Sequence, residues 1–210
     1  MTPRILVKTL MAGFAALLVT VAAHANPFDD QTGWELAKEK KGFTAWTKQE
    51  DGKRVKTYRV TGTFKSSRDK IMALLTDAEN YHSWYSKSNA SKPVEKLGEY
   101  EYVFWSDYDM PFIYTDRDMV LHGKAEQISD NAVLILIEGT PDAYPLQDDY
   151  VRVQDTQQAI LIEELEGGEY RVTQQVYLDP GEEIGAGLIN GRLGGEAINF
   201  MRDLADALEE

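Results

Sequence analysis

The chain contains no cysteine and only three histidines among its 210 residues. Without cysteine it forms no disulfide, carries no lipid on an N-terminal cysteine and lacks a thiolate nucleophile. His82 and His122 do not stand at a zinc-ligand spacing, and His24 lies in an apolar leader. No Gly-x-Ser-x-Gly motif is present either. The sequence therefore predicts neither a metal site nor a cofactor.

Basic residues are also scarce. The chain has 22 Lys and Arg against 35 Asp and Glu, a net charge of −13, and no basic run that would form a binding patch. Nucleic-acid phosphates and anionic lipid surfaces repel a protein of this charge. We expect no nucleic-acid partner.

The first 25 residues have the pattern of a secretory signal peptide. Arg4 and Lys8 precede an apolar stretch that ends in Ala23-His24-Ala25, an A-x-A cleavage motif. A retained membrane anchor is the alternative, although a spanning helix needs about 20 apolar residues and this stretch is shorter. We expect cleavage near Ala25 and export to the periplasm. Residues 26–210 then form a single domain with a net charge of −15, since both cations and no acid leave.

The remaining chain predicts an α+β fold. Helical spacing is expected in residues 31–42, in 66–85 and after Asp179-Pro180-Gly181, and two strands flank the Asp51-Gly52 turn within residues 43–64. Short turns join the later strands, which indicates antiparallel pairing. The order predicts a curved antiparallel sheet wrapped around an amphipathic C-terminal helix. The other expected strands are 93–97, 99–108, 117–128, 132–138, 150–165 with a break, and 170–178.

One helix cannot fill the concave face of so wide a sheet, so we expect an internal apolar cavity. Val172 and Val176 would form one wall, with the polar Gln174 between them. Met119 and Leu121 would form another, on a strand face whose side chains become smaller toward Gly123 and Ala125. The alternative is that both rows belong to an ordinary filled core.

Aromatic residues concentrate between residues 100 and 114, before three consecutive charged residues at 116–118. Trp105, Phe112 and Tyr114 suit the rim of an apolar site, although aromatics also fill cores. Alternation places Arg117 on the face of Met119 and needs a partner for its charge. Asp116, Asp107, Asp109 and Glu101 are the candidates. We expect an ion pair that pins the preceding loop, with direct ligand contact as the alternative.

Three stretches resemble signatures of START domains, the steroidogenic-acute-regulatory-related lipid-transfer domains. They are "LLTDAENYHSWY" (74–85), "MPFIYTDRDMVLHG" (110–123) and "VYLDPGEEIGAGLINGRLG" (176–194), in the order of that family. The resemblance implies the helix-grip fold of the SRPBCC superfamily. It also implies a deep cavity for one lipid or other apolar molecule, closed by the last helix and by the loop at residues 106–116. His122 and Gly123 stand where sterol-binding members carry a basic residue, so the resemblance does not imply a sterol.

The expected function is to bind and carry, or sense, a hydrophobic small molecule in the periplasm, with transient contact with a membrane. One alternative is a superfamily enzyme, of the cyclase or hydrolase kind, acting in the same cavity. Another is an interaction protein whose acidic surface docks on a cationic partner. The oligomeric state is left open. The predicted ligand-binding residues are Trp105, Phe112, Tyr114, Arg117, Met119, Leu121, Val172, Gln174, Val176, Leu188 and Met201.

Overall fold

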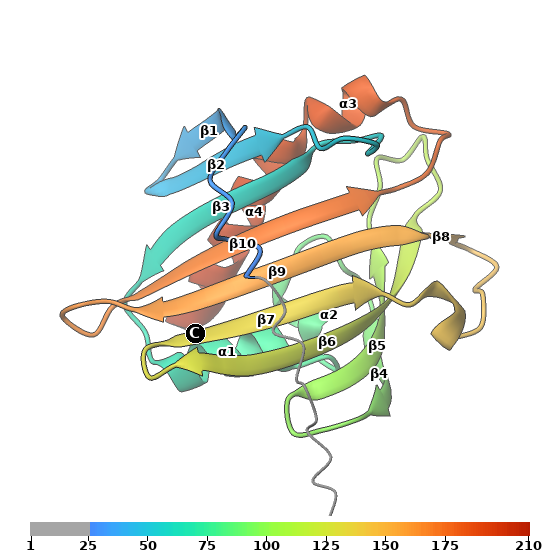
Figure 1. The fold of residues 1–210 in the computed structure, drawn as a ribbon. Helices are drawn as coiled ribbons and strands as arrows, with labels where there is room; N and C mark the ends of the chain where they lie inside the picture. Colours follow the sequence, from blue (N-terminus) through green and yellow to red (C-terminus); the bar gives the residue numbers. More distant parts are fainter. Residues whose placement is uncertain (1–25) are drawn as a thin grey trace, which may run out of the picture.

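A computed structural model describes residues 26–210, so the predicted signal peptide lies outside the described residues. The sheet has the strand order β1-β2-β3-β10-β9-β7-β6-β5-β4, and the short β8 pairs with β6 (Figure 1). The strands are β1 (Glu35–Lys40), β2 (Phe43–Lys48), β3 (Thr57–Phe64), β4 (Ser91–Lys96), β5 (Glu101–Tyr108), β6 (Arg117–Ser129), β7 (Ala132–Gly139), β8 (Val151–Arg152), β9 (Asp155–Glu164) and β10 (Tyr170–Asp179). The helices are α1 (Arg68–Thr76), α2 (Tyr81–Trp84), a 3-10 turn η1 (Pro141–Ala143), α3 (Ala186–Asn190) and α4 (Leu193–Glu209).

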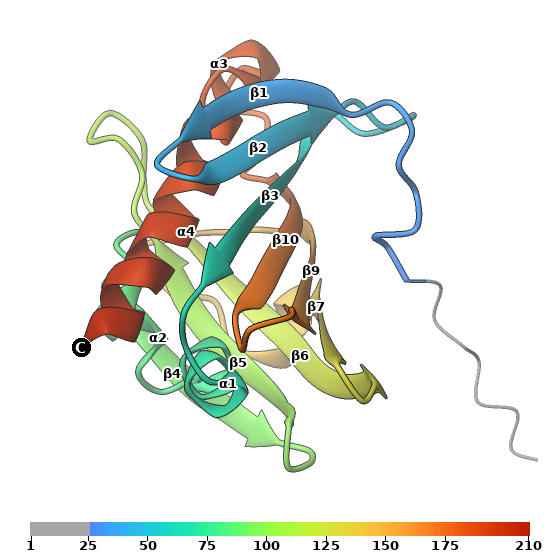
Figure 2. The ribbon, with the colours of Figure 1, turned by 90° about the vertical axis from the view of Figure 1, so that its left-hand side faces the viewer.

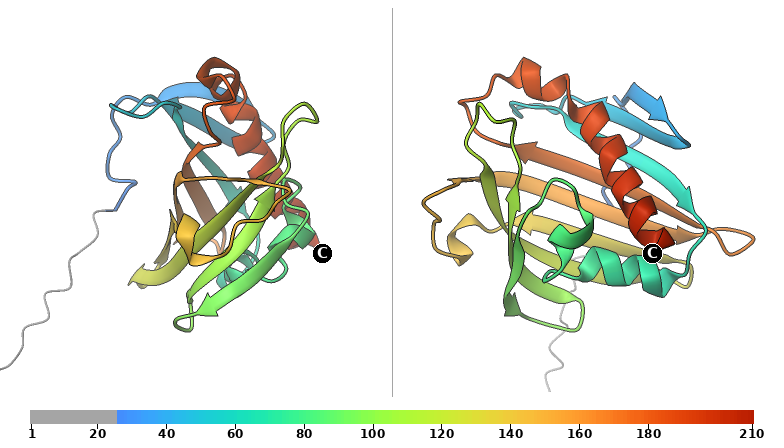
Figure 3. Two further views of the ribbon diagram at one scale, coloured as in Figure 1. Left: turned by 90° about the vertical axis from the view of Figure 1, so that its right-hand side faces the viewer. Right: turned by 180° about the vertical axis from the view of Figure 1, so that it is seen from behind.

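The curved antiparallel sheet with a long C-terminal helix is confirmed. All neighbours along the main strand order pair antiparallel, and the parallel contact of β8 with β6 is the exception. The sheet curls so that α4 crosses its open, concave side, with α1 and α2 beside it (Figures 2 and 3). None of the helices in the described part of the chain is long and apolar enough to span a membrane.

The helix predicted at residues 31–42 is wrong. That segment contains β1, which pairs with β2 through a turn at Lys41 and Gly42, where φ is 54° and 82°. Two successive positive φ values make the tight turn that suits the twist of a hairpin. All six residues of β1 are exposed, so it is an edge strand whose backbone pairing outweighs the helix propensity of its side chains.

Individual side chains determine where α1 begins and how closely α4 packs on the sheet. Ser67 caps α1 by accepting a hydrogen bond from the Lys70 backbone N–H at 3.2 Å. The glycine at 194 lets α4 approach β1 closely, because a Cβ there would lie 3.1 Å from the Cβ of Ala37. The buried side chains of α4 face the core cluster on the concave side; they include Leu193, Ala197, Phe200, Met201 and Leu204.

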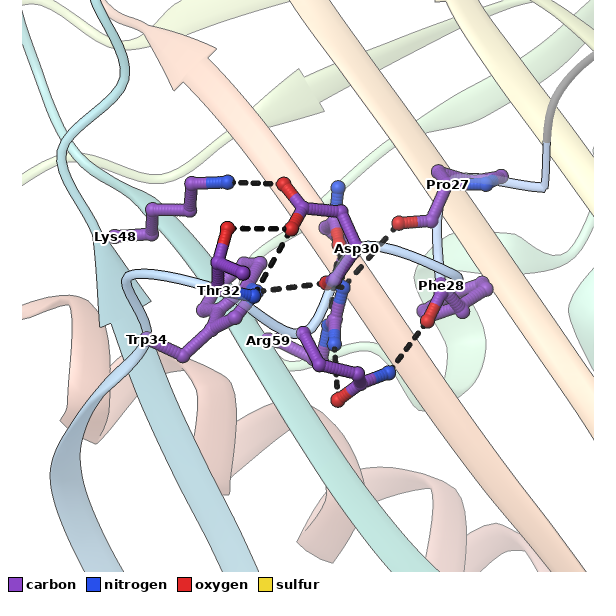
Figure 4. Close-up of polar contacts among 9 residues, drawn as sticks. Pro27, Phe28, Asp30, Thr32, Trp34, Lys48 and Arg59 are labelled. Carbon is purple, nitrogen blue, oxygen red and sulfur yellow. Dashed lines mark hydrogen bonds and ion pairs between the residues drawn. The ribbon is translucent and has the colours of Figure 1, made fainter.

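The segment before β1 packs on the convex side of the sheet (Figure 4). The Phe28 side chain is buried in a small cluster with residues of β7 and β9. The Arg59 guanidinium lies between the rings of Phe28 and Trp34 and donates to the carbonyl oxygens of Pro27 and Asp30 at 3.2 and 3.0 Å. These contacts hold the segment of residues 27–34 on the sheet.

Candidate functional site

A pocket of about 140 Å³ lies between the concave face of the sheet and the helices. Its sheet side comes from β3, β5, β6, β7, β9 and β10, and its helical side from α1 to α4. Alternation along β5 sets which side chains enter it, since Tyr102, Phe104 and Tyr108 line it. Val103 and Trp105, which alternate with them, belong to a cluster on the opposite face.

Six of the predicted ligand-binding residues line this pocket. Tyr114 stands at its rim, Met119 and Leu121 come from β6, and Gln174 and Val176 from β10. Leu188 of α3 is the sixth. β6 and β10 belong to the same curved sheet, with β7 and β9 between them, so side chains from two separate sequence stretches line one concave face. Contact of these residues with a ligand stays a prediction.

The other five do not line it. Val172 and Met201 are fully buried in the core cluster beside the pocket. Trp105 lies on the opposite face, packed edge-on against Tyr150, because it alternates with the inward-facing Phe104. Phe112 is 97% exposed at the tip of the β5–β6 loop. For these residues, placement on the pocket wall is wrong in this structure. Arg117, the fifth, is discussed below.

Five tyrosine hydroxyls are among the polar groups that line the pocket, namely those of Tyr58, Tyr81, Tyr85, Tyr102 and Tyr108. Burial raises the pKa of each hydroxyl above its ordinary value of 10. They are therefore neutral at physiological pH and available as hydrogen-bond donors. The Tyr58 hydroxyl donates to Gln174 Oε1 at 3.3 Å, which accounts for the polar residue in an apolar wall.

Glu196 is a pocket residue that sequence reasoning missed. It lies on α4 between Leu193 and Phe200, which also line the pocket, at spacings that share one helix face. Its charge contributes to the raised pKa of Tyr58, Tyr85 and Tyr108, after their burial. Its position between two apolar residues of that face was the available signal. The missed aromatic residues Tyr81, Tyr85 and Phe200 carry no comparable signal.

Arg117 is fully buried and joins the two sides of the pocket rim. Its Nε donates to the Pro180 carbonyl oxygen at 2.8 Å, and its Nη1 donates to that of Thr115. Its ionic partner is Glu183, at 3.3 Å. Arg117 therefore links the end of the β5–β6 loop to the β10–α3 connection.

The partners predicted for Arg117 are wrong, because each of the four acids has another bond. Asp116 accepts from the Met110 backbone N–H, and Asp107 accepts from the backbone N–H groups of residues 89 and 90. Asp109 pairs with Lys87, and Glu101 with His122. The side chain that pairs with Arg117 comes from a segment 66 residues later in the chain.

A second buried charge pair lies behind the rim, on the other face of β6. Arg152 donates to both carboxylate oxygens of Asp118, at 2.9 and 2.8 Å, and Trp105 Nε1 donates to the same carboxylate at 2.7 Å. Arg152 also binds carbonyl oxygens of the loop that carries η1, including that of Tyr144 at 2.9 Å. Asp118 therefore has a structural role. Of the consecutive charged residues, Arg117 lies at the pocket rim and Asp118 on the other face of β6.

No family model matches the sequence. An uncharacterized protein of Pseudomonas aeruginosa is 27% identical over 200 residues, which cover 95% of this chain and 96% of that protein. The crystal structure of a STAR-related lipid transfer protein from Xanthomonas axonopodis is 25% identical, with a TM-score of 0.79, and covers 85% of this chain and 99% of that one. Human StAR-related lipid transfer protein 5 has a TM-score of 0.79 at 12% identity, covering 87% and 89%, which supports the fold alone.

The helix-grip architecture, the three motifs in their order and the likeness to the Xanthomonas protein agree over nearly the whole described domain. The chain has the helix-grip fold of START domains, and these findings are consistent with a START domain of the SRPBCC superfamily.

Proposed function

We propose that this protein binds one lipid-like molecule in the pocket under α4 and carries or senses it in the periplasm. The observation that carries the proposal is the pocket itself, whose lining is mostly apolar and aromatic, with hydroxyl, amide and carboxylate groups and the cations Lys87 and Arg192. Its START neighbours, among them the STAR-related lipid transfer protein from Xanthomonas, support binding of a lipid or other hydrophobic ligand.

Binding energy would come from apolar burial, at about 25 cal/mol per Å². The pocket volume of about 140 Å³ compares with a cavity of about 150 Å³ that holds a benzene-sized molecule. A lipid chain is larger, so the pocket must widen to hold one. The proposed moving parts are the β5–β6 loop and α3, which flank the pocket mouth.

The same rim would make the transient contact with a membrane. Phe112 and Ile113 at the tip of the β5–β6 loop are 97% and 66% exposed, and Leu188 on α3 is also exposed. Exposed apolar side chains on the two flanks of the pocket mouth suit contact with an apolar surface. A sedimentation assay with neutral phosphatidylcholine vesicles tests this: Phe112→Asp should reduce binding, and unchanged binding would contradict it.

Export with cleavage near Ala25 is part of the proposal. The A-x-A motif at residues 23–25 supports it, and the packing of Phe28 and the Arg59 contacts to residues 27 and 30 show that the chain joins the domain just after that motif. Mass mapping of the N-terminal peptide from a periplasmic fraction should find a start near Asn26. An intact N-terminus, or recovery only from membranes, would contradict it.

No specific observation favours the enzyme alternative. Within residues 26–210, His82 contacts Ser91 and His122 contacts Glu101, and neither histidine lines the pocket.

The direct test of binding is a thermal-unfolding panel of single-chain and two-chain amphiphiles. A ligand that binds only the folded protein raises the Tm with concentration. We expect such a rise for at least one amphiphile, with the compound recovered unchanged. The absence of any shift across the panel would overturn the proposal, and chemical conversion of the compound would favour the enzyme.

A further inference from the structure

Glu196 has a carboxylate oxygen without a hydrogen-bond partner in the pocket wall. Three buried side-chain nitrogen or oxygen atoms within residues 26–210 lack a partner: Thr57 Oγ1, Trp84 Nε1 and Glu196 Oε2. Of their residues, only Glu196 lines the pocket under α4. A buried polar atom left without a partner is costly, so such an atom in a binding site points to a group that the ligand supplies.

The other acids of the pocket already have partners. Asp77 accepts hydrogen bonds from the backbone N–H groups of residues 79 and 80, and Asp107 accepts them from residues 89 and 90. Asp109 pairs with Lys87 at 3.8 Å. Glu196 has no ion pair within the described part of the chain. It is therefore the pocket acid that is free to receive a donor.

The surroundings of Glu196 favour a hydrogen-bond donor or a cation beside its carboxylate. It lies in the first turn of α4, where the positive end of the helix dipole stabilises an anion. Three buried tyrosines experience its charge, so it lies within the aromatic part of the pocket. Aromatic ring faces attract cations, and apolar rings around a carboxylate strengthen its attraction to a donor.

The cations of the pocket wall do not offset this charge. Lys87 is engaged with Asp109, and Arg192 is exposed at the mouth. An anionic head group placed beside Glu196 would meet a like charge, which disfavours it.

We infer that the pocket selects amphiphiles whose buried polar end donates a hydrogen bond to Glu196, a protonated amine or a hydroxyl, over those ending in a carboxylate. This inference rests on the proposed function and specifies the ligand class of that same pocket. The apolar tail would then extend along the sheet wall, past Leu121 and Val176.

Three amphiphiles of equal chain length test the selection by isothermal titration calorimetry, namely decylamine, 1-decanol and decanoate, each below its micelle concentration. Because a hydrogen bond to a charged group contributes more than a neutral one, decylamine should bind about tenfold or more tighter than decanoate, with decanol between them. Glu196→Gln keeps the shape and removes the charge. It should weaken decylamine about tenfold and leave decanol within about threefold, since the amide oxygen still accepts.

Glu209→Gln is the matched control, because Glu209 is an exposed acid on the same helix. It should leave all three affinities unchanged, and circular dichroism checks that both variants fold. Equal or tighter binding of decanoate, or an amine-to-acid ratio that Glu196→Gln does not change, would overturn this inference while leaving the proposed function in place. Failure of all three compounds and of a two-chain panel to bind would overturn both.

Discussion

Arg117 Nε and the carbonyl oxygen of Pro180 lie 2.8 Å apart, and this hydrogen bond ties the first residue of β6 to the segment that leads into α3. The same side chain holds the Thr115 carbonyl, so one buried guanidinium fixes both flanks of the pocket mouth. Any opening of the pocket between these flanks must break or stretch these contacts.

Arg117→Leu should loosen the rim without unfolding the domain. It leaves two carbonyl oxygens without a donor, at about 1–3 kcal/mol each, so we expect a loss of about 2–6 kcal/mol. Hydrogen exchange should speed up in residues 109–116 and 180–185. Glu183→Gln is the control: its side chain is 66% exposed, so it should cost less than about 1 kcal/mol. Unchanged exchange in both segments of Arg117→Leu would contradict the role given to Arg117.

Leu121→Trp and Val172→Trp should separate the pocket wall from the filled core. Leu121 lines the pocket and Val172 does not, although both are buried. A tryptophan at 121 can extend into the pocket, so it should block ligand uptake at a modest cost in stability. At 172 the larger ring has no space, and overpacking should cost about 1–3 kcal/mol or more, with ligand binding kept in the folded fraction. Unfolding curves and a ligand titration on both variants check this, and equal ligand binding by the two would refute the wall assignment.

Asp118→Ala should be far more destabilising than removal of a surface pair. It leaves the buried guanidinium of Arg152 without its counter-charge, which costs about 3–5 kcal/mol. Asp155→Ala removes the partly exposed pair with Lys53 and should cost less than about 1 kcal/mol. Urea denaturation of the two variants gives both values. Similar losses in the free energy of unfolding would contradict a stabilising role for the Asp118–Arg152 pair.

Asp179 should give the turn before α3 a dependence on acid. Its pKa is lowered from the ordinary 3.8, first by hydrogen bonding to Arg54, which donates from Nε to Oδ2 at 2.8 Å. A group with a depressed folded-state pKa contributes stability that is full above its unfolded pKa and is lost as the pH falls through the folded one. The destabilisation caused by Asp179→Asn should therefore be larger at pH 7 than below pH 3. An equal loss at both pH values would contradict this.

The sequence predicted most of the sheet because the later strands alternate strongly and are separated by clear turns. It failed at residues 35–40, where the side chains favour a helix and only pairing with β2 makes a strand. It also misplaced Trp105, since a concentration of aromatics does not say which of two neighbours, Phe104 or Trp105, points inward. That choice depends on a register of one residue.

The polar contacts of the site could not be predicted from local sequence patterns, for a different reason. Arg117 is paired with Glu183, which the fold brings close only after β10 has returned along the sheet. Glu196 could be placed on α4 by periodicity, but an acid in the first turn of a helix is ordinary. Its missing partner appears only when the surrounding side chains are in position.

Native mass spectrometry of the protein purified from its own host tests the central claim most directly. We expect the folded wild-type protein to carry one amphipathic molecule per chain, released intact on activation. Leu121→Trp, purified in parallel, should carry none or much less. A wild-type protein that is found empty and takes up no lipid on incubation, or an equal load in Leu121→Trp, would contradict ligand carriage in the pocket under α4.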